Sequence, residues 1–114
     1  MARARGLGPE AREALSDPAN DVYVSAASAW EIAIKRAKGT LEAPADVRPA
    51  IAKSGFKELP ISVAHALAAG ALPVYHRDPF DRVLIAQARL ESMSLVTTDA
   101  VIGRYDVDVL PAAE

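Results

Sequence analysis

Hydrophobic and polar positions along the chain follow two different periods. Apolar residues recur at helical spacing from Trp30 and again from Pro79, whereas short β-branched runs bounded by turn residues indicate strands. The expected helices are 9–15, 26–38, 45–53, 63–69 and 79–90, with a short helical turn at 99–103, and the expected strands are 21–25, 56–61, 94–97 and 107–110. Because strands alternate with helices, we expect an α/β fold with a parallel sheet and crossover helices.

Glycine and proline residues mark the ends of these expected helices. Pro79 suits a first helical position, and Gly39, Gly55 and Gly70 are each expected to end the helix before them. Residues 1–8 carry no periodic signal, and we expect them to be disordered. The remaining segment, 9–110, is expected to form the domain.

Composition narrows the class of protein. A chain of 114 residues with 51% hydrophobic and 25% charged residues is typical of one globular domain. The absence of cysteine excludes disulfide scaffolds, zinc ribbons and cysteine nucleophiles. A net charge of −2 argues against bulk electrostatic binding of nucleic acid, and 5% aromatic residues argue against a base-stacking platform.

Neither a membrane span nor a secretory signal is predicted. The longest charge-free run, 59–76, contains Pro60, Gly70 and Pro73, which do not suit a membrane helix. The basic residues near Met1 are not followed by an apolar stretch. We therefore expect the protein to be cytoplasmic.

Three carboxylates fall where strands end or helices begin. Glu31 follows the strand at 21–25, Asp81 lies in the first turn of the helix from Pro79, and Asp99 follows the strand at 94–97. In an open parallel sheet, ligands bind beyond the carboxyl ends of the strands. Converging carboxylates repel one another unless they share a cation, and hard oxygen ligands suit Mg²⁺ or Mn²⁺.

Helix capping offers a structural alternative for each of these carboxylates. Ser28 and Glu31 have the spacing of a capping box, and Asp99 could cap the turn after it. Glu31 could instead form a surface pair with Lys35. Asp81 lies above an apolar stripe, so its charge needs a partner, which could be a cation, Arg77 or Arg82.

The two histidines and the basic residues give weaker signals. His65 lies in an alanine-rich helix and is expected to be a half-buried spacer, whereas His76 and Arg77 lie on a loop that could contact phosphates or be solvated. Lys35, Arg36 and Lys38 form a compact basic cluster, which could meet RNA or simply complement the end of its helix.

Three segments of the chain stand out, namely VYVSAASAWEIAIKRAKGTLEAP, HRDPFDRVLIAQA and LVTTD. Together they resemble the PIN-domain family, and more narrowly the VapC-type toxins of type II toxin–antitoxin systems. The resemblance runs from about Pro9 to Leu110. It implies a three-layer α/β sandwich around a parallel sheet, an acidic cluster that binds Mg²⁺ or Mn²⁺, and endoribonuclease activity. It also implies neutralisation by a cognate antitoxin, and we expect a homodimer.

The resemblance assigns roles to residues that match its motifs. Glu31, Asp81 and Asp99 match metal-binding and catalytic acids, and Thr97 occupies a polar position that helps to hold water or metal. Asp78 belongs to the subfamily motif in the segment HRDPFDRVLIAQA, where we expect it to cap the helix and not to bind metal. The residues expected to contact the RNA substrate are Lys35, Arg36, Arg77 and Arg82.

The chain departs from the family pattern at its start. The family begins with an apolar strand that ends in a metal-binding aspartate, and residues 1–8 show neither the apolar run nor the acid. We therefore expect a partial PIN-like domain without that first strand, with weak metal binding and weak or absent cleavage. The alternative is a catalytically inactive remnant that binds an antitoxin or a second copy of itself through the helices at 26–38 and 62–70.

Overall fold

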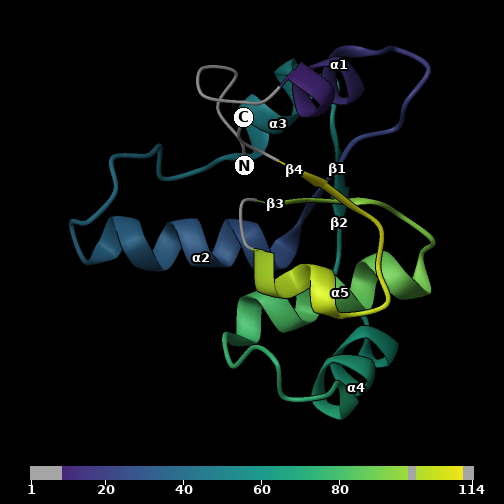
Figure 1. The fold of residues 1–114 in the computed structure, drawn as a ribbon. Helices are drawn as coiled ribbons and strands as arrows, with labels where there is room; N and C mark the ends of the chain where they lie inside the picture. Colours follow the sequence, from purple (N-terminus) through teal and green to yellow (C-terminus); the bar gives the residue numbers. More distant parts are fainter. Residues whose placement is uncertain (1–8, 98–99, 112–114) are drawn as a thin grey trace. The chain divides into compact units, whose positions relative to one another are not determined.

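The computed structural model of the protein describes residues 9–97 and 100–111. Figure 1 shows the order of its helices and strands along the chain. The elements are α1 (Pro9–Ser16), β1 (Tyr23–Ser25), α2 (Ala26–Ala37), α3 (Arg48–Lys53), β2 (Lys57–Leu59), α4 (Val63–Ala71), α5 (Pro79–Leu90), β3 (Leu95–Thr97), η1 (Ala100–Arg104) and β4 (Val109–Pro111). Each expected helix and strand is therefore present, with ends that differ by a few residues.

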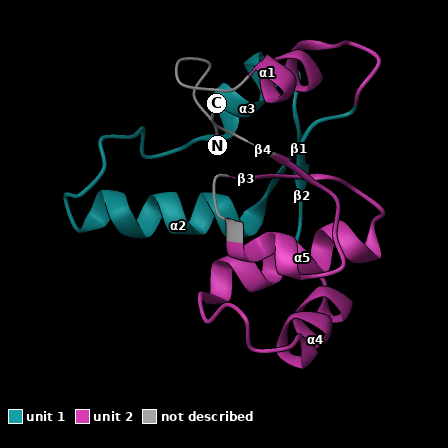
Figure 2. Cartoon of the chain, in the orientation of Figure 1, with its two compact units in different colours: residues 1, 21–60 teal, residues 2–20, 61–114 magenta. Residues whose placement is uncertain are grey.

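The chain divides into two compact units, coloured separately in Figure 2. Unit 1 comprises residues 21–60 and holds β1, α2, α3 and β2. The described residues before and after this segment form unit 2, which holds α1, α4, α5, β3, η1 and β4. Unit 1 is thus inserted into the sequence of unit 2.

Each unit contains one pair of parallel strands. In unit 1, β1 pairs with β2 so that Val24 lies opposite Glu58, and in unit 2, β3 pairs with β4 so that Val96 lies opposite Leu110. Parallel strands need a crossover between them, and α2 and α3 form the crossover in unit 1. The predicted α/β class with parallel strands is confirmed, with the strands in two pairs.

Two glycines end helices as the sequence predicts. Gly39 follows the end of α2 and Gly55 follows the end of α3, and both adopt a φ of +76°. At the end of α2 the Gly39 and Thr40 amides donate to the carbonyls of Arg36 and Lys35. This paired pattern satisfies helix carbonyls that would otherwise lack a partner.

The expectation that Gly70 ends α4 is wrong. The helix continues through Gly70 to Ala71, and Leu72 is extended, with φ −61° and ψ 147°. A proline disfavours helical geometry in the residue before it, so Pro73 sets the end of α4. Glycine tolerates a helical position without being required to end the helix.

Unit 2 has a hydrophobic cluster between α4, α5 and the C-terminal elements. Its buried members are Leu72, Ile85, Ile102 and Tyr105, and partly buried side chains of β3, β4 and the segment before β4 pack against them. Ile85 lies on the apolar stripe that the sequence indicates for α5, and its side chain is fully buried. Through Leu72 and Ile85 the cluster includes the residue after α4 and the interior of α5.

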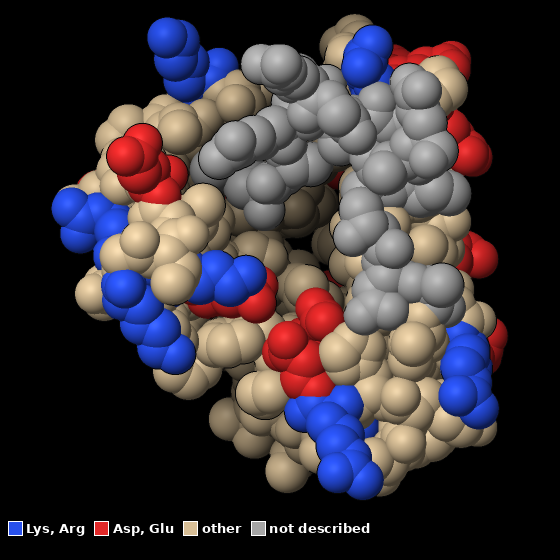
Figure 3. Space-filling view, turned by 60° about the vertical axis from the view of Figure 1, so that its left-hand side comes forward, with Lys and Arg blue, Asp and Glu red and all other residues tan. Residues whose placement is uncertain are grey.

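Large apolar side chains of α2 and α4 remain exposed. Trp30 on α2 is 60% exposed, and Val63 and Leu67 on α4 are 75% and 71% exposed. The apolar face predicted for α2 is therefore not covered at Trp30. No helix among the described residues has the length and hydrophobicity of a membrane span. Figure 3 shows both acidic and basic side chains on one face of the molecule.

Candidate functional site

Asp81 lies in the first turn of α5, where the sequence places it. Asp78 is the N-cap, and its Oδ1 accepts hydrogen bonds from the backbone amides of Phe80 at 2.8 Å and Asp81 at 3.4 Å. Pro79 occupies the first helical position. The prediction that Asp78 caps this helix is confirmed, and capping fixes the backbone from which the Asp81 side chain projects.

His76 is a partner of the Asp81 carboxylate. The His76 Nε2 lies 2.9 Å from Asp81 Oδ2, with the two side chains 15% and 25% exposed. The sequence predicts a cation, Arg77 or Arg82 as partner of this carboxylate and does not indicate His76. The one sequence feature that could indicate His76 is its position, two residues before the cap of the helix that carries Asp81.

The His76 ring is held through both of its nitrogens. The backbone amide of Asp78 donates to Nδ1 at 3.1 Å, so this nitrogen carries no proton in that hydrogen bond. Nε2 is then the protonated nitrogen, and it donates to Asp81. The arrangement fixes both the ring orientation and the tautomer.

A buried tyrosine holds the loop that carries His76. The Tyr105 hydroxyl donates to the carbonyl of Pro73 at 2.7 Å and accepts from the amides of Tyr75 at 3.0 Å and His76 at 2.8 Å. Tyr105 is 5% exposed. One hydroxyl therefore fixes three backbone groups of this loop, a role that sequence periodicity does not indicate.

Arg82 also holds this loop. Its guanidinium donates to the carbonyls of Ala69 at 2.8 Å, Leu72 at 3.0 Å and His76 at 3.1 Å, among others. These carbonyls belong to the end of α4 and the segment that follows it. The geometry gives Arg82 a structural role, and its expected contact with RNA stays a prediction.

Glu31 lies in the interior of α2, in unit 1. The helix begins at Ala26 and Ser25 is its cap, with Ser25 Oγ accepting from the amide of Ala27 at 3.0 Å. The capping-box alternative with Ser28 is therefore wrong. Glu31 Oε2 lies 3.6 Å from Lys35 Nζ, which confirms the alternative of a surface pair one helical turn apart.

The remaining candidates divide between described and undescribed residues. Thr97 is the last residue of β3 and pairs in register with Pro111, whereas Asp99 lies outside the described residues. Among the expected RNA contacts, Arg36 Nε donates to the carbonyl of Ala43 at 2.9 Å, and Lys35 and Arg77 are exposed. Their roles stay predictions.

A resident cation would need ligands beyond those that the structure describes. Asp81 offers a partly exposed carboxylate, the hard oxygen donor that Mg²⁺ and Mn²⁺ prefer. Within 9–97 and 100–111, however, no three histidine, aspartate or glutamate side chains come together as a metal site. Of the three acids that the resemblance implies, Glu31 belongs to unit 1 and Asp81 to unit 2, and Asp99 lies outside the described residues.

One carboxyl of unit 1 has a lowered pKa. In unit 1, the hydrogen bond from the Arg48 guanidinium lowers the pKa of Asp46 from 3.8 to about 2. Asp46 also accepts from the backbone amide of Arg48 at 3.0 Å and so supports the start of α3, whose N-cap residue Val47 has no side-chain cap. This shifted carboxyl thus belongs to a helix end and not to the candidate site.

Comparison with protein families matches residues 3–108 to the PIN domain. Comparisons with curated proteins and with solved structures find no match. The family match covers most of the chain. The described elements form an α/β fold with parallel strands, and Asp81 lies in the first turn of a helix. The chain therefore belongs to the PIN domain family.

Proposed function

We propose that this protein is a VapC-like toxin, a cytoplasmic endoribonuclease that cleaves RNA phosphodiester bonds with Mg²⁺ or Mn²⁺ and is neutralised by a cognate antitoxin. PIN domains are generally metal-dependent nucleases, which supports hydrolase activity at the level of the family. The VapC-like role is supported by the segment from Asp78 to Ala88 and the LVTTD motif that follows it, which together are a fairly specific part of the resemblance.

The observation that carries the proposal is the setting of Asp81. Its carboxylate lies at the start of a helix, remains partly exposed and is held by His76. An exposed carboxylate can reach a ligand in solution, and a fixed one loses little conformational freedom when it does so. Two buried or partly buried residues, Tyr105 and Arg82, are committed to the loop beside it.

The proposed cofactor is a divalent cation, with Glu31, Asp81 and Asp99 as the ligands that the resemblance implies. Such an ion, when bound, polarises the phosphodiester and activates water for in-line attack. The described residues position the Asp81 carboxylate. Asp78 fixes the first turn of α5, and His76 fixes the carboxylate itself. The RNA contacts proposed with this site are Lys35, Arg36, Arg77 and Arg82.

The test is cleavage of structured RNA by the full chain in the presence of Mn²⁺. We expect cleavage that is lost on chelation and falls by at least about 100-fold in Asp81→Asn, because removing a ligand or catalytic group has effects of that order. Asp106→Asn is the matched control, since Asp106 is an exposed aspartate of the same unit. Equal cleavage by wild type and Asp81→Asn would refute the proposed role of Asp81.

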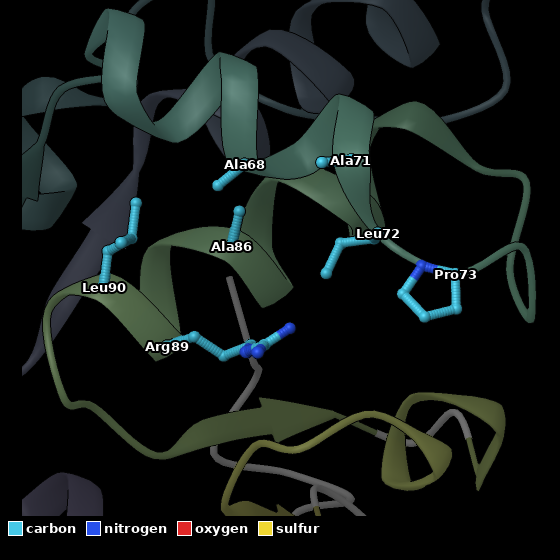
Figure 4. A pocket seen from close by; sticks show the side chains of 7 residues that line it. All are labelled: Ala68, Ala71, Leu72, Pro73, Ala86, Arg89 and Leu90. Carbon is cyan, nitrogen blue, oxygen red and sulfur yellow. The ribbon is translucent and has the colours of Figure 1, made fainter.

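The second candidate function is a binding protein that docks an antitoxin or a second copy of the chain. It is favoured by the exposed apolar side chains of α2 and α4, since such surfaces commonly mark interaction sites. Unit 2 also has a pocket of about 420 Å³. Figure 4 shows its lining, which comprises Ala68, Ala71, Leu72, Pro73, Ala86, Arg89 and Leu90.

The two candidates separate in one comparison. A binding protein retains its association with the antitoxin or its homodimer in Asp81→Asn and loses it in Leu67→Glu, without cleavage by either protein. A nuclease shows cleavage in Leu67→Glu and loses it in Asp81→Asn. Light scattering and the RNA assay on the same preparations distinguish these outcomes.

A further inference from the structure

We propose that His76 is a positioning residue that fixes the Asp81 carboxylate by donating a hydrogen bond from Nε2, with its tautomer set by the backbone amide of Asp78. The proposal rests on the proposed function, in which Asp81 acts on RNA. It adds a residue whose role is orientation, and it assigns a function to the loop between α4 and α5.

The geometry supports donation from His76 to Asp81 and not the reverse. Asp78 N lies 3.1 Å from His76 Nδ1 and can act only as a donor, so Nδ1 is the acceptor. The remaining nitrogen lies 2.9 Å from Asp81 Oδ2, a short distance typical of a hydrogen bond to a charged acceptor. A carboxylate bound in this way has one oxygen fixed to an oriented ring.

The ring itself has a rigid support. Tyr105 accepts from the amide of His76 and donates to the carbonyl of Pro73, and Arg82 donates to the carbonyl of His76. The backbone of His76 is thus bonded through both its amide and its carbonyl. Because Tyr105 is 5% exposed and belongs to the hydrophobic cluster of unit 2, the orientation of the ring is tied to the core.

A second histidine provides an internal comparison. His65 Nδ1 accepts from the amide of Ser62 at 3.0 Å, and its Nε2 lies 3.0 Å from Glu91 Oε1. The pattern of backbone amide, ring and carboxylate is the same, but His65 is 3% exposed and connects the start of α4 to the residue after α5. His65 thus serves as the structural counterpart against which a positioning role of His76 can be measured.

The test uses two substitutions that each keep one of the two hydrogen bonds. The amide nitrogen of His76→Gln can take the place of Nε2 and donate to Asp81, whereas the side-chain oxygen of His76→Asn can take the place of Nδ1 and accept from Asp78. A positioning role predicts that RNA cleavage stays within about threefold of wild type in His76→Gln and falls roughly 10- to 100-fold in His76→Asn. A role limited to supporting the helix start predicts the reverse order and would overturn the proposal.

His65→Asn and His65→Gln are the matched controls, measured below their unfolding temperatures. We expect both to lower thermal stability and to leave the cleavage rate per folded molecule unchanged. A fall in cleavage equal to that of His76→Asn would mean that loss of any such histidine suffices, which would overturn the specific role of His76.

A second readout requires neither RNA nor a cation. Nitrogen-15 NMR of the full chain distinguishes protonated from unprotonated ring nitrogens, and we expect the His76 proton on Nε2. A proton on Nδ1 would overturn the proposal even if the enzyme is active. The expected tautomer in a protein that cleaves no RNA would instead preserve the positioning of Asp81 and refute only the proposed function.

Discussion

Single side chains hold the loop before α5, and Arg82 forms more hydrogen bonds to it and to the end of α4 than Tyr105 does. Its planar guanidinium presents several donors in a fixed fork, and the carbonyls at the end of α4 lie within reach of them. Helix carbonyls near a C-terminus lack partners within the helix. Pro73 has no amide proton and cannot donate to these carbonyls, so Arg82 supplies the donors.

We predict that Arg82→Lys lowers the free energy of unfolding by about 2 kcal/mol, because one ammonium cannot reach all of these carbonyls and partly buried acceptors lose their donors. Urea denaturation measures the change. Arg77→Lys is the control, since Arg77 is an exposed neighbour and its substitution should stay within roughly 0.5 kcal/mol of wild type. Equal stabilities of the two variants would contradict this role of Arg82.

The sequence was informative about which residues matter near Asp81 and less so about how they bond. The apolar stripe below Asp81 correctly indicated that its carboxylate needs a partner. The identity of the partner depended on the path of the loop from Pro73 to Asp78, which Tyr105 sets from a distant part of the chain. Local spacing carries no information about such a contact.

Helices are the scale at which the sequence was most predictive, since apolar periods and capping residues act locally. The corrections came from competing local signals, namely Ser25 over Ser28 as the cap of α2 and Pro73 over Gly70 at the end of α4. The end of α5 shows a further departure. Ser92 occupies the position that glycine fills after α2 and α3, with a φ of 54°, and the Met93 amide donates to the carbonyl of Ala88.

We predict that Ser92→Gly raises the free energy of unfolding by about 0.5 kcal/mol. Glycine removes the steric cost of a left-handed residue, which exceeds its greater loss of backbone entropy. The midpoint of urea unfolding should increase. Gly55→Ser, at the matching position after α3, should lower that midpoint, and a decrease for Ser92→Gly would contradict the argument.

At the scale of the whole molecule, sequence alternation predicted the α/β class but not the division into two units. Strand pairing is a long-range property, and three-residue strands give little periodic signal. For the site, the sequence likewise does not predict the surroundings of the three candidate acids. Glu31 is paired with Lys35 in unit 1, Asp81 with His76 in unit 2, and Asp99 lies outside the described residues.

We predict that acrylamide quenches the fluorescence of Trp30 efficiently in dilute protein, because this residue is the single tryptophan and is 60% exposed. If the proposed homodimer or antitoxin covers α2, quenching should decrease as that complex forms. Free tryptophan amide measured alongside gives the limit of full accessibility. Weak quenching at the lowest protein concentration would contradict the exposure of Trp30.

Contact between α1 and β4 has a consequence for how the protein is made. These are the first and last described elements of unit 2, and Ala11 of α1 is fully buried. A helix of eight residues is marginal on its own in water. On the ribosome, α1 is synthesised early but gains its neighbour only after β4 has emerged, so a nascent chain halted before β4 should leave α1 open to proteolysis.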